Sequence, residues 1–125
     1  MVDIVKKKTN NPTKIRFDNY FAYKTSKYTQ KEFRNIFKYA PELTPNMYEK
    51  ELVIKRIFGR NAFGRSDAKL VAGWLFNLHS KGIVQGDFSS TDTLIDENDK
   101  VWVVDWENAN EGLQFIDVVG FVHKL

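Results

Sequence analysis

The sequence predicts a small α+β domain, and three patterns support this prediction. Two short segments near the amino terminus alternate apolar and polar residues, two longer segments repeat apolar residues at helical spacing, and two strand-like runs in the last third flank a polar turn. The 125 residues, 42% hydrophobic and 28% charged, are enough for one hydrophobic core. We therefore expect one domain over residues 1–125, with a reduced amino-terminal portion of residues 1–65.

The first predicted structure is a β-hairpin. Residues 13–17 and 20–24 alternate apolar and polar side chains, as strands with one buried face do. Asp18 and Asn19, which stand between these segments, are residue types that favour tight turns because their short side chains bond to nearby backbone. The two strands are therefore expected to pair with each other.

A helix is predicted next, over about residues 30–40, because apolar residues recur there every three or four positions. Thr29 and Glu32 have the spacing of a capping box, in which the two side chains satisfy backbone amides at the start of the helix. Pro41 has no amide hydrogen to donate and is expected to end the helix.

Residues 46–58 have two interpretations. Thr44 followed by Pro45 is typical of a helix start, which favours a helix over this segment. The alternative is a strand at residues 52–54, where Leu, Val and Ile stand together and two of the three are β-branched. A loop with two glycines follows at residues 58–64.

The carboxy-terminal portion is predicted to begin with a helix over about residues 67–80, capped by Ser66 and ended by Gly82. Residues 93–95 and 101–104 are strand-like and flank a polar, acidic turn, which indicates a second hairpin. An apolar run follows it, and we expect a last helix there, at residues 113–122.

The charge of the chain is unevenly distributed. Residues 1–65 contain 15 Lys and Arg against 6 Asp and Glu, whereas residues 86–111 contain 8 acidic residues and one lysine. A basic half can contact nucleic acid or other phosphates, and an acidic cluster can hold a divalent cation; mutual neutralisation within the fold is the alternative. The absence of cysteine excludes disulfides, thiolate metal sites and a cysteine nucleophile. No apolar run is long enough to cross a bilayer, so we expect a cytoplasmic protein without membrane contact.

Four short motifs in the carboxy-terminal portion stand in a recognisable order. A helix ending in Leu78-His79 precedes Gln85-Gly86-Asp87; Asp92 follows five residues after Asp87, and a strand then ends in Asp105-Trp106-Glu107. This order resembles the catalytic loop and metal-binding strand end of the kinase-like phosphotransferases, and within them the aminoglycoside phosphotransferase and choline kinase group. The resemblance covers roughly residues 66–121. It implies a truncated or minimal kinase-like fold, with a mainly helical carboxy-terminal lobe at residues 66–125.

The resemblance also implies roles for individual carboxylates. Asp87 takes the place of the catalytic base that receives the proton of the acceptor hydroxyl. Asp105 takes the place of the principal metal ligand, with Asp92 and Glu107 as further ligands. Oxygen ligands of this kind suit Mg²⁺, a hard cation.

A nucleotide site is implied as well, though with two departures from the family pattern. Lys24 stands where the phosphate-binding lysine is expected, and Glu32 stands where its ion-pair partner is expected. Gln85 replaces the usual histidine and is expected to brace the loop with a hydrogen bond. Asp92 replaces the usual asparagine and adds a carboxylate beside the phosphates.

The function that the resemblance implies is Mg²⁺-dependent transfer of the γ-phosphate of ATP to a hydroxyl of a small molecule. The alternative is a catalytically inactive kinase-like module that binds a partner. A nucleic-acid-binding domain that uses the basic residues 1–65 is less favoured. A protein partner or a second copy of the chain could complete the cleft. The segment Gly59 to Ser66 approximates a phosphate-binding P-loop, but Arg65 stands where that loop has its lysine, so we favour an ordinary turn.

Overall fold

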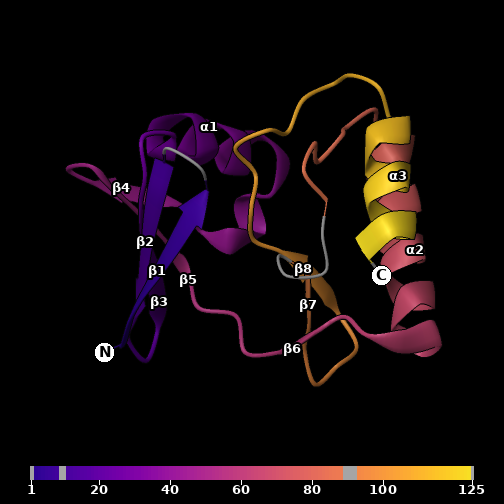
Figure 1. Ribbon diagram of the computed structural model, residues 1–125, viewed down its shortest axis with the longest axis horizontal. Helices are drawn as coiled ribbons and strands as arrows, with labels where there is room; N and C mark the ends of the chain where they lie inside the picture. The colour runs from indigo at the N-terminus through magenta and orange to yellow at the C-terminus, as the bar shows by residue number, and fades with distance from the viewer. Residues whose placement is uncertain (1, 9–10, 89–92, 125) are drawn as a thin grey trace. The chain divides into compact units, whose positions relative to one another are not determined.

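Two antiparallel sheets, each with its own helices, make up the fold of the computed structural model (Figure 1). The structure describes residues 2–8, 11–88 and 93–124. It divides into two units, Met1–Arg56 and Ile57–Leu125. This agrees with the predicted α+β class, while a single domain over the whole chain stays a prediction.

The first unit is a five-stranded sheet with one α-helix and one 3₁₀-helix. Its elements are β1 (Val2–Lys8), β2 (Asn11–Phe17), β3 (Phe21–Thr25), α1 (Thr29–Tyr39), η1 (Pro41–Leu43), β4 (Asn46–Tyr48) and β5 (Glu51–Lys55). The strands lie in the order β1-β2-β3-β5-β4, and all neighbours are antiparallel. Helix α1 contacts β4 and β5.

The predicted hairpin is present as β2 and β3, which pair from Lys14 with Thr25 to Phe17 with Ala22. The carboxylate of Asp18 accepts hydrogen bonds from the amides of Tyr20 and Phe21 at 2.8 and 2.7 Å, which closes the turn. Strand β1 was not predicted. Its second half is a run of lysines, so the strand does not show an alternation of apolar and polar residues. It pairs along its whole length with β2.

Helix α1 covers the predicted segment and ends before Pro41, but the predicted capping box is wrong. The helix starts at Thr29, and its cap residue Tyr28 makes no side-chain bond to the first turn. The hydroxyl of Thr29 donates instead to the carbonyls of Ser26 and Lys50, the second of which lies before β5. A tertiary contact has therefore taken the place of the local cap.

The helix predicted over residues 46–58 is wrong, and the strand alternative is correct. Strands β4 and β5 occupy this segment, joined by a turn in which Glu49 has a positive φ of 58°. Leu52, Val53 and Ile54 are all buried, because β5 is an interior strand. A strand buried on both faces has a continuous apolar run, which sequence periodicity alone does not separate from a helix.

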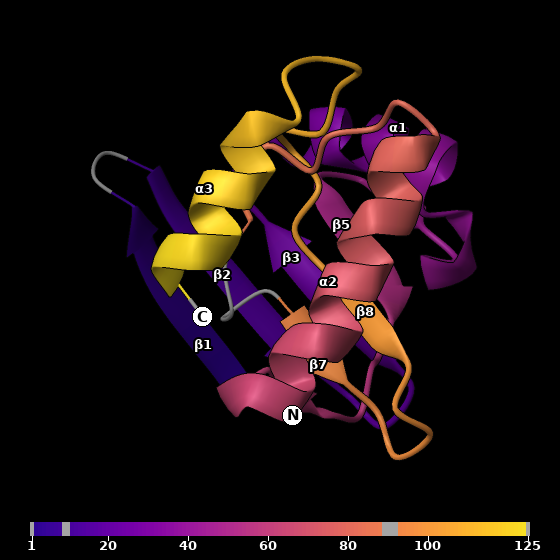
Figure 2. The same cartoon turned by 90° about the vertical axis from the view of Figure 1, so that its right-hand side faces the viewer.

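The second unit combines a small sheet with two α-helices. Its elements are β6 (Arg60–Asn61), α2 (Gly64–Ser80), β7 (Thr93–Ile95), β8 (Val101–Val103) and α3 (Phe115–Lys124). The sheet has the order β6-β7-β8, and α2 lies against β8 (Figure 2). Strand β6 was not predicted; it lies within the segment that approximates a P-loop, which therefore has a strand where that motif needs a loop.

Helix α2 begins three residues earlier than predicted, and Ser66 does not cap it. The cap residue is Phe63, whose amide donates to the carboxylate of Asp67 at 3.1 Å. Arg60 also donates to this carboxylate, at 2.7 Å. The predicted end is confirmed: Gly82 follows the helix with a φ of +76°, a conformation that glycine adopts without strain.

The second hairpin and the last helix are present close to their predicted positions. Asp96 organises the hairpin turn, since its carboxylate accepts from the amides of Asn98 and Lys100 and from the indole nitrogen of Trp102. This confirms that Asp96 belongs to the turn. Helix α3 starts at Phe115, two residues later than predicted.

The hydrogen bonds that Asp67 accepts from Arg60 and from the amide of Phe63 predict an acid sensitivity of the second unit. The side chain of Arg60 and the amide of Phe63 hold the pKa of Asp67 below its ordinary value. Because the pKa is lower in the folded state, the ionised carboxylate stabilises the fold at pH values above the unfolded-state pKa of about 3.9. This stabilisation is lost as the pH falls through the lower pKa of the folded state. We expect Asp67→Asn to lose less stability than the wild type between pH 6 and pH 3 in thermal melts. Glu97→Gln, in the exposed turn, is the control; equal acid sensitivity of Asp67→Asn and wild type would contradict the prediction.

Candidate functional site

In the first unit, Lys24 and Glu32 form a buried ion pair. The ammonium nitrogen of Lys24, on β3, lies 2.7 Å from the Oε1 atom of Glu32, on α1. The Glu32 side chain is fully buried and that of Lys24 is 16% exposed. Only residues 26–28 separate β3 from α1, so the strand leads directly into the helix that carries its partner. Removing either partner of a buried pair leaves an uncompensated charge, so the two side chains hold each other in place.

In the second unit, one buried carboxylate fixes the loop that precedes Asp87. Asp117, on α3, is fully buried and accepts hydrogen bonds from the amides of Gln85 and Gly86, both at 2.8 Å. Its Oδ2 atom also lies 2.9 Å from Nε2 of His79, near the end of α2. Asp117 therefore joins the last helix, the end of α2 and the loop through a single side chain.

Gln85 links the loop to the segment after β8. Its side chain is buried, its Nε2 donates to the backbone carbonyl of Asp105, and its Oε1 accepts from the amide of Asp87 at 2.9 Å. An amide side chain can donate and accept at the same time without changing its protonation state. The backbone positions of Asp87 and Asp105 are thus coupled through one residue, as expected for a residue that braces the loop.

Two further contacts hold the loop against residues 108–110. Val84 and Asn110 exchange both backbone hydrogen bonds, at 2.7 and 2.9 Å. Gly86 has a φ of +92°, and a Cβ atom there would collide with the backbone carbonyl of Asn108. Glycine is therefore required at this position for two reasons, conformation and space. The result is a rigid backbone that carries the exposed side chain of Asp87.

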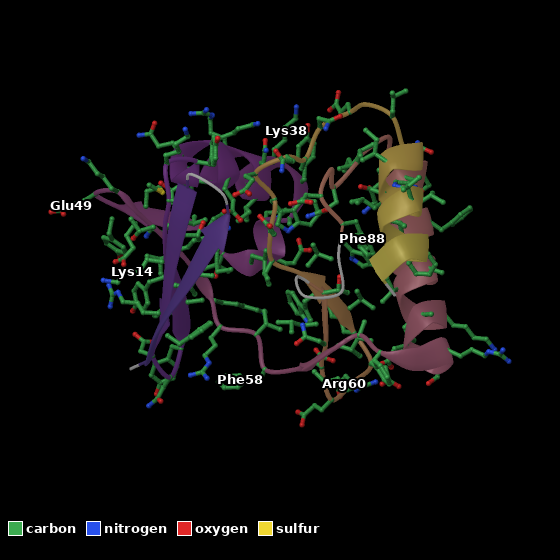
Figure 3. All side chains as sticks on the ribbon, viewed as in Figure 1. Lys14, Lys38, Glu49, Phe58, Arg60 and Phe88 are labelled. Atoms are coloured by element: carbon green, nitrogen blue, oxygen red, sulfur yellow. The ribbon has the colours of Figure 1, made fainter. Side chains whose placement is uncertain are left out.

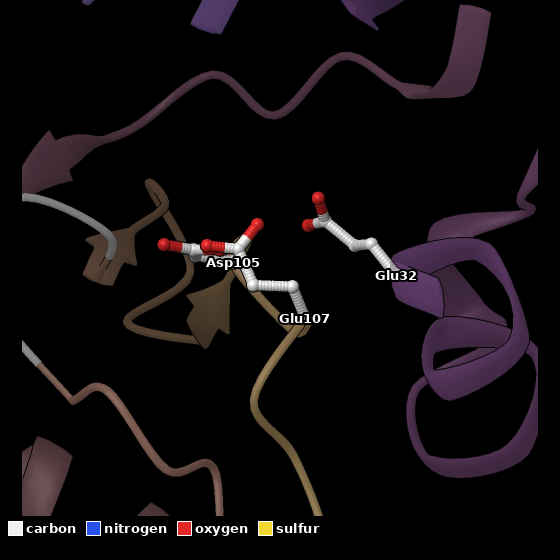
Figure 4. A group of neighbouring side chains, drawn as sticks. All are labelled: Glu32, Asp105 and Glu107. Carbon is white, nitrogen blue, oxygen red and sulfur yellow. The ribbon is translucent and has the colours of Figure 1, made fainter. Parts of the chain in front are cut away.

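Two carboxylates stand next to each other after β8. A carboxylate oxygen of Asp105 lies within 4.8 Å of one of Glu107; Figure 4 draws both side chains, together with Glu32 on α1. Between them in the sequence, Trp106 is buried and donates its indole N–H to the carbonyl of Val103 at 2.7 Å, which anchors the segment. Adjacent carboxylate oxygens are the ligands that Mg²⁺ prefers, so the donor set fits this ion.

The structure thus brings together several residues that were singled out in the sequence. Lys24 lies against Glu32, the amide of Gln85 contacts the backbone of Asp87 and Asp105, and Asp105 lies near Glu107. Asp92 is outside the described residues. The roles assigned to all of these residues stay predictions.

Sequence reasoning missed Asp117 and assigned His79 only to the end of a helix. The signal for Asp117 was a single acidic residue inside an apolar run, at residues 113–122. A buried carboxylate needs hydrogen-bond donors, so its position in such a run indicates that donors are brought to it by other parts of the chain. Which donors these are depends on the tertiary structure.

Comparison with known proteins gives a likeness in structure only. No family model matches the sequence, and no curated protein matches it. A crystal structure of monomeric WbdD has a TM-score of 0.61 and 15% identity, over 89% of this chain and 36% of that one. A structure of WbdD described as a bifunctional kinase-methyltransferase has a TM-score of 0.53 and 16% identity, over 81% of this chain and 30% of that one. A co-crystal structure of WbdD with the kinase inhibitor LY294002 has a TM-score of 0.50 and 16% identity, over 84% and 32%.

These neighbours show a kinase-like fold for this chain. The chain spans about a third of the length of the WbdD structures that it matches. The comparisons support the kinase-like part of the predicted resemblance and do not support its narrower assignment to the aminoglycoside phosphotransferase and choline kinase group. Among the described residues, no helix has both the length and the apolar character needed to span a membrane.

The contacts of Asp117 predict a large effect on stability. Asp117→Ala removes the acceptor of the Gln85 and Gly86 amides and the partner of His79, and leaves buried donors unsatisfied. We expect a loss of about 2–4 kcal/mol in the free energy of unfolding, measured by urea denaturation. Asp117→Asn keeps one carbonyl acceptor and should lose less. If Asp117→Ala unfolds with the same urea midpoint as the wild type, these hydrogen bonds do not stabilise the fold.

The contacts of Gln85 predict a pH dependence for one variant. In Gln85→Glu the new carboxylate still accepts from the Asp87 amide but faces the Asp105 carbonyl, to which only a protonated carboxyl can donate. The folded state therefore raises the pKa of the new group. The protonated form stabilises the fold at pH values below the unfolded-state pKa of glutamic acid, about 4.3. This stabilisation is lost as the pH rises through the higher pKa of the folded state. Urea denaturation at pH 5 and pH 8 should show a larger deficit against wild type at pH 8; an equal deficit would contradict the contact.

Proposed function

We propose that this chain is the core of a kinase-like phosphotransferase that transfers the γ-phosphate of ATP to a hydroxyl of a small molecule. The observation that carries the proposal is the buried 2.7 Å ion pair between Lys24 and Glu32, in a chain whose structural neighbours include a kinase-methyltransferase. A lysine presented from a strand and held by a helix glutamate is the arrangement by which kinases position a phosphate-binding ammonium.

Lys24 is the residue proposed to contact the nucleotide phosphates. Its ammonium group is a compact charge with three donors, so it can bond Glu32 with one proton and phosphate oxygens with the others. The pair with Glu32 fixes the direction of the flexible side chain before nucleotide binds. WbdD has been co-crystallised with a kinase inhibitor, and we extend ligand binding of this kind to the present chain as part of the proposal.

Asp87 is the proposed catalytic base. Its side chain is exposed, whereas its backbone amide is held by Gln85, so an accessible carboxylate is carried on a fixed support. A base must reach the acceptor hydroxyl within hydrogen-bond distance to remove its proton during transfer. The rigid loop provides this positioning without a further moving part.

Asp105 and Glu107 are the residues proposed to hold Mg²⁺, with Asp92 as a further ligand on the strength of the sequence. When bound, the ion neutralises charge on the phosphate oxygens. Asp105 is buried and its backbone carbonyl is held by Gln85, so its carboxylate has little freedom to turn away.

The proposal predicts separable effects of three substitutions. ATP with Mg²⁺ should stabilise the wild type in a thermal-shift assay, by about 2.7 kcal/mol at 100 times the dissociation constant. Lys24→Met should remove this shift, and Asp105→Asn should remove its dependence on Mg²⁺. Asp87→Asn should keep the shift and lower phosphate transfer or ATP hydrolysis by about 10²–10⁴-fold. Lys14→Met, on the exposed surface of β2, is the matched control for Lys24→Met and should behave as wild type.

Three results would contradict parts of the proposal. If millimolar ATP with Mg²⁺ does not raise the melting temperature of the wild type, the chain does not bind nucleotide. A shift without any phosphate transfer would identify the chain as a catalytically inactive nucleotide-binding module. Full turnover in Asp87→Asn would remove Asp87 from the role of base.

A further inference from the structure

The outer face of α1 carries a stripe of positive charge. Lys31, Arg34 and Lys38 follow one another at intervals of three and four residues on α1, so they lie on one side of the helix. Lys27 stands two residues before the helix, and all four side chains are exposed. Figure 3 labels Lys38 at the end of this stripe. With a rise of about 1.5 Å per residue, the helical part of the stripe, from Lys31 to Lys38, extends over roughly 10 Å.

This arrangement opposes the stability of the helix. Like charges at intervals of three or four residues repel each other, and Lys31 lies in the first helical turn, where the helix dipole disfavours a cation. The only carboxylate of α1 is Glu32, which is buried and paired with Lys24. Lys31 and Arg34 therefore lower helix stability, and α1 has no acidic residue on their face of the helix, which favours an anionic partner for these two cations.

Other acidic residues of this unit are engaged elsewhere. Glu51 forms a two-pronged ion pair with Arg16, with contacts of 2.6 and 3.0 Å. The carboxylate of Asp18 accepts from the hydroxyl of Tyr23 and from the backbone of the β2–β3 turn. Glu51 and Asp18 therefore have partners other than the cations of α1.

An aromatic ring lies on the same exposed side of the helix. Phe37 follows Arg34 by three residues, and 68% of its surface is exposed. Gln30, also exposed, precedes Phe37 by seven residues and lies on the same line along the helix. Cations that follow a phosphate backbone, combined with exposed rings on which bases stack, are the means by which proteins bind single-stranded nucleic acid.

The apolar face of α1 argues against a lipid surface as the partner. A basic helix that binds membranes inserts its apolar face between the lipids. In α1 that face is turned inward: Ile36 is fully buried, and Ala40 directly after the helix is 1% exposed. One exposed phenylalanine is left, which suits a single stacked base better than insertion into a bilayer.

We propose that the outer face of α1, together with Lys27 just before the helix, binds single-stranded nucleic acid. Lys27, Lys31 and Arg34 contact successive phosphates, and Phe37 lies against a base. This function is separate from phosphate transfer, since none of these residues belongs to the candidate site. The cations contact the phosphates of the nucleic-acid backbone and do not read the bases. Binding is therefore expected to depend little on base sequence.

The experiment is titration of the whole chain into a fluorescein-labelled oligouridylate of about 12 nucleotides, followed by fluorescence anisotropy at several salt concentrations. For three phosphate contacts on a single strand, the logarithm of the affinity should fall with the logarithm of salt with a slope of about −2. The double variant Lys31→Gln/Arg34→Gln should reduce the size of this slope by about 1.4. Phe37→Ala should weaken binding about tenfold and leave the slope unchanged.

The matched control is Lys14→Gln/Lys50→Gln, which removes the same charge from exposed positions outside the stripe. It should bind nearly as wild type. If both double variants weaken oligonucleotide binding equally, binding depends only on the net charge of the chain, and the proposal is wrong. The proposal also fails if the wild type ignores the oligonucleotide, or if it binds vesicles of phosphatidylcholine and phosphatidylserine in preference to it.

Discussion

The second unit depends on one buried carboxylate. Asp117 is fully buried on α3 among mostly apolar residues, where a carboxyl group needs hydrogen-bond partners. Two backbone amides of the loop before Asp87 and the ring of His79 supply them. Because the amides belong to Gln85 and Gly86, the same interaction that satisfies the acid also fixes the loop. Stability and the geometry of the candidate site therefore rest on the same bonds.

Gln85 extends this constraint from the loop to the segment after β8. Its amide group uses its donor on the Asp105 carbonyl and its acceptor on the Asp87 amide. Glutamine does this at any pH, whereas a histidine in its place could accept from an amide only while neutral. Gln85 thus links the two segments without a titratable group.

The first unit shows how a buried ion pair and a charged surface can coexist in one small sheet. Lys24 and Arg16 each have a carboxylate partner, Glu32 and Glu51, so their charges are compensated within the unit. The cations of α1 lie on the opposite side of that helix from Glu32. The first unit therefore has an internal, paired set of charges and an external set on α1.

The sequence by itself determined the elements that have local signals. The β2–β3 hairpin, the extent of α1, the β7–β8 hairpin and the stop at Gly82 all follow from neighbouring residues. It could not determine β5, because an interior strand and a buried helix have the same apolar run. It also could not determine β1, whose lysines hide its alternation, or β6, whose partner β7 lies more than 30 residues away in the sequence. The predicted capping box of α1 was wrong because the hydroxyl of Thr29 donates to the carbonyl of Lys50, a residue 21 positions away in the sequence. The contacts of Asp117 with Gln85, Gly86 and His79 join residues more than 30 positions apart, and only the tertiary structure brings such donors to a buried acid.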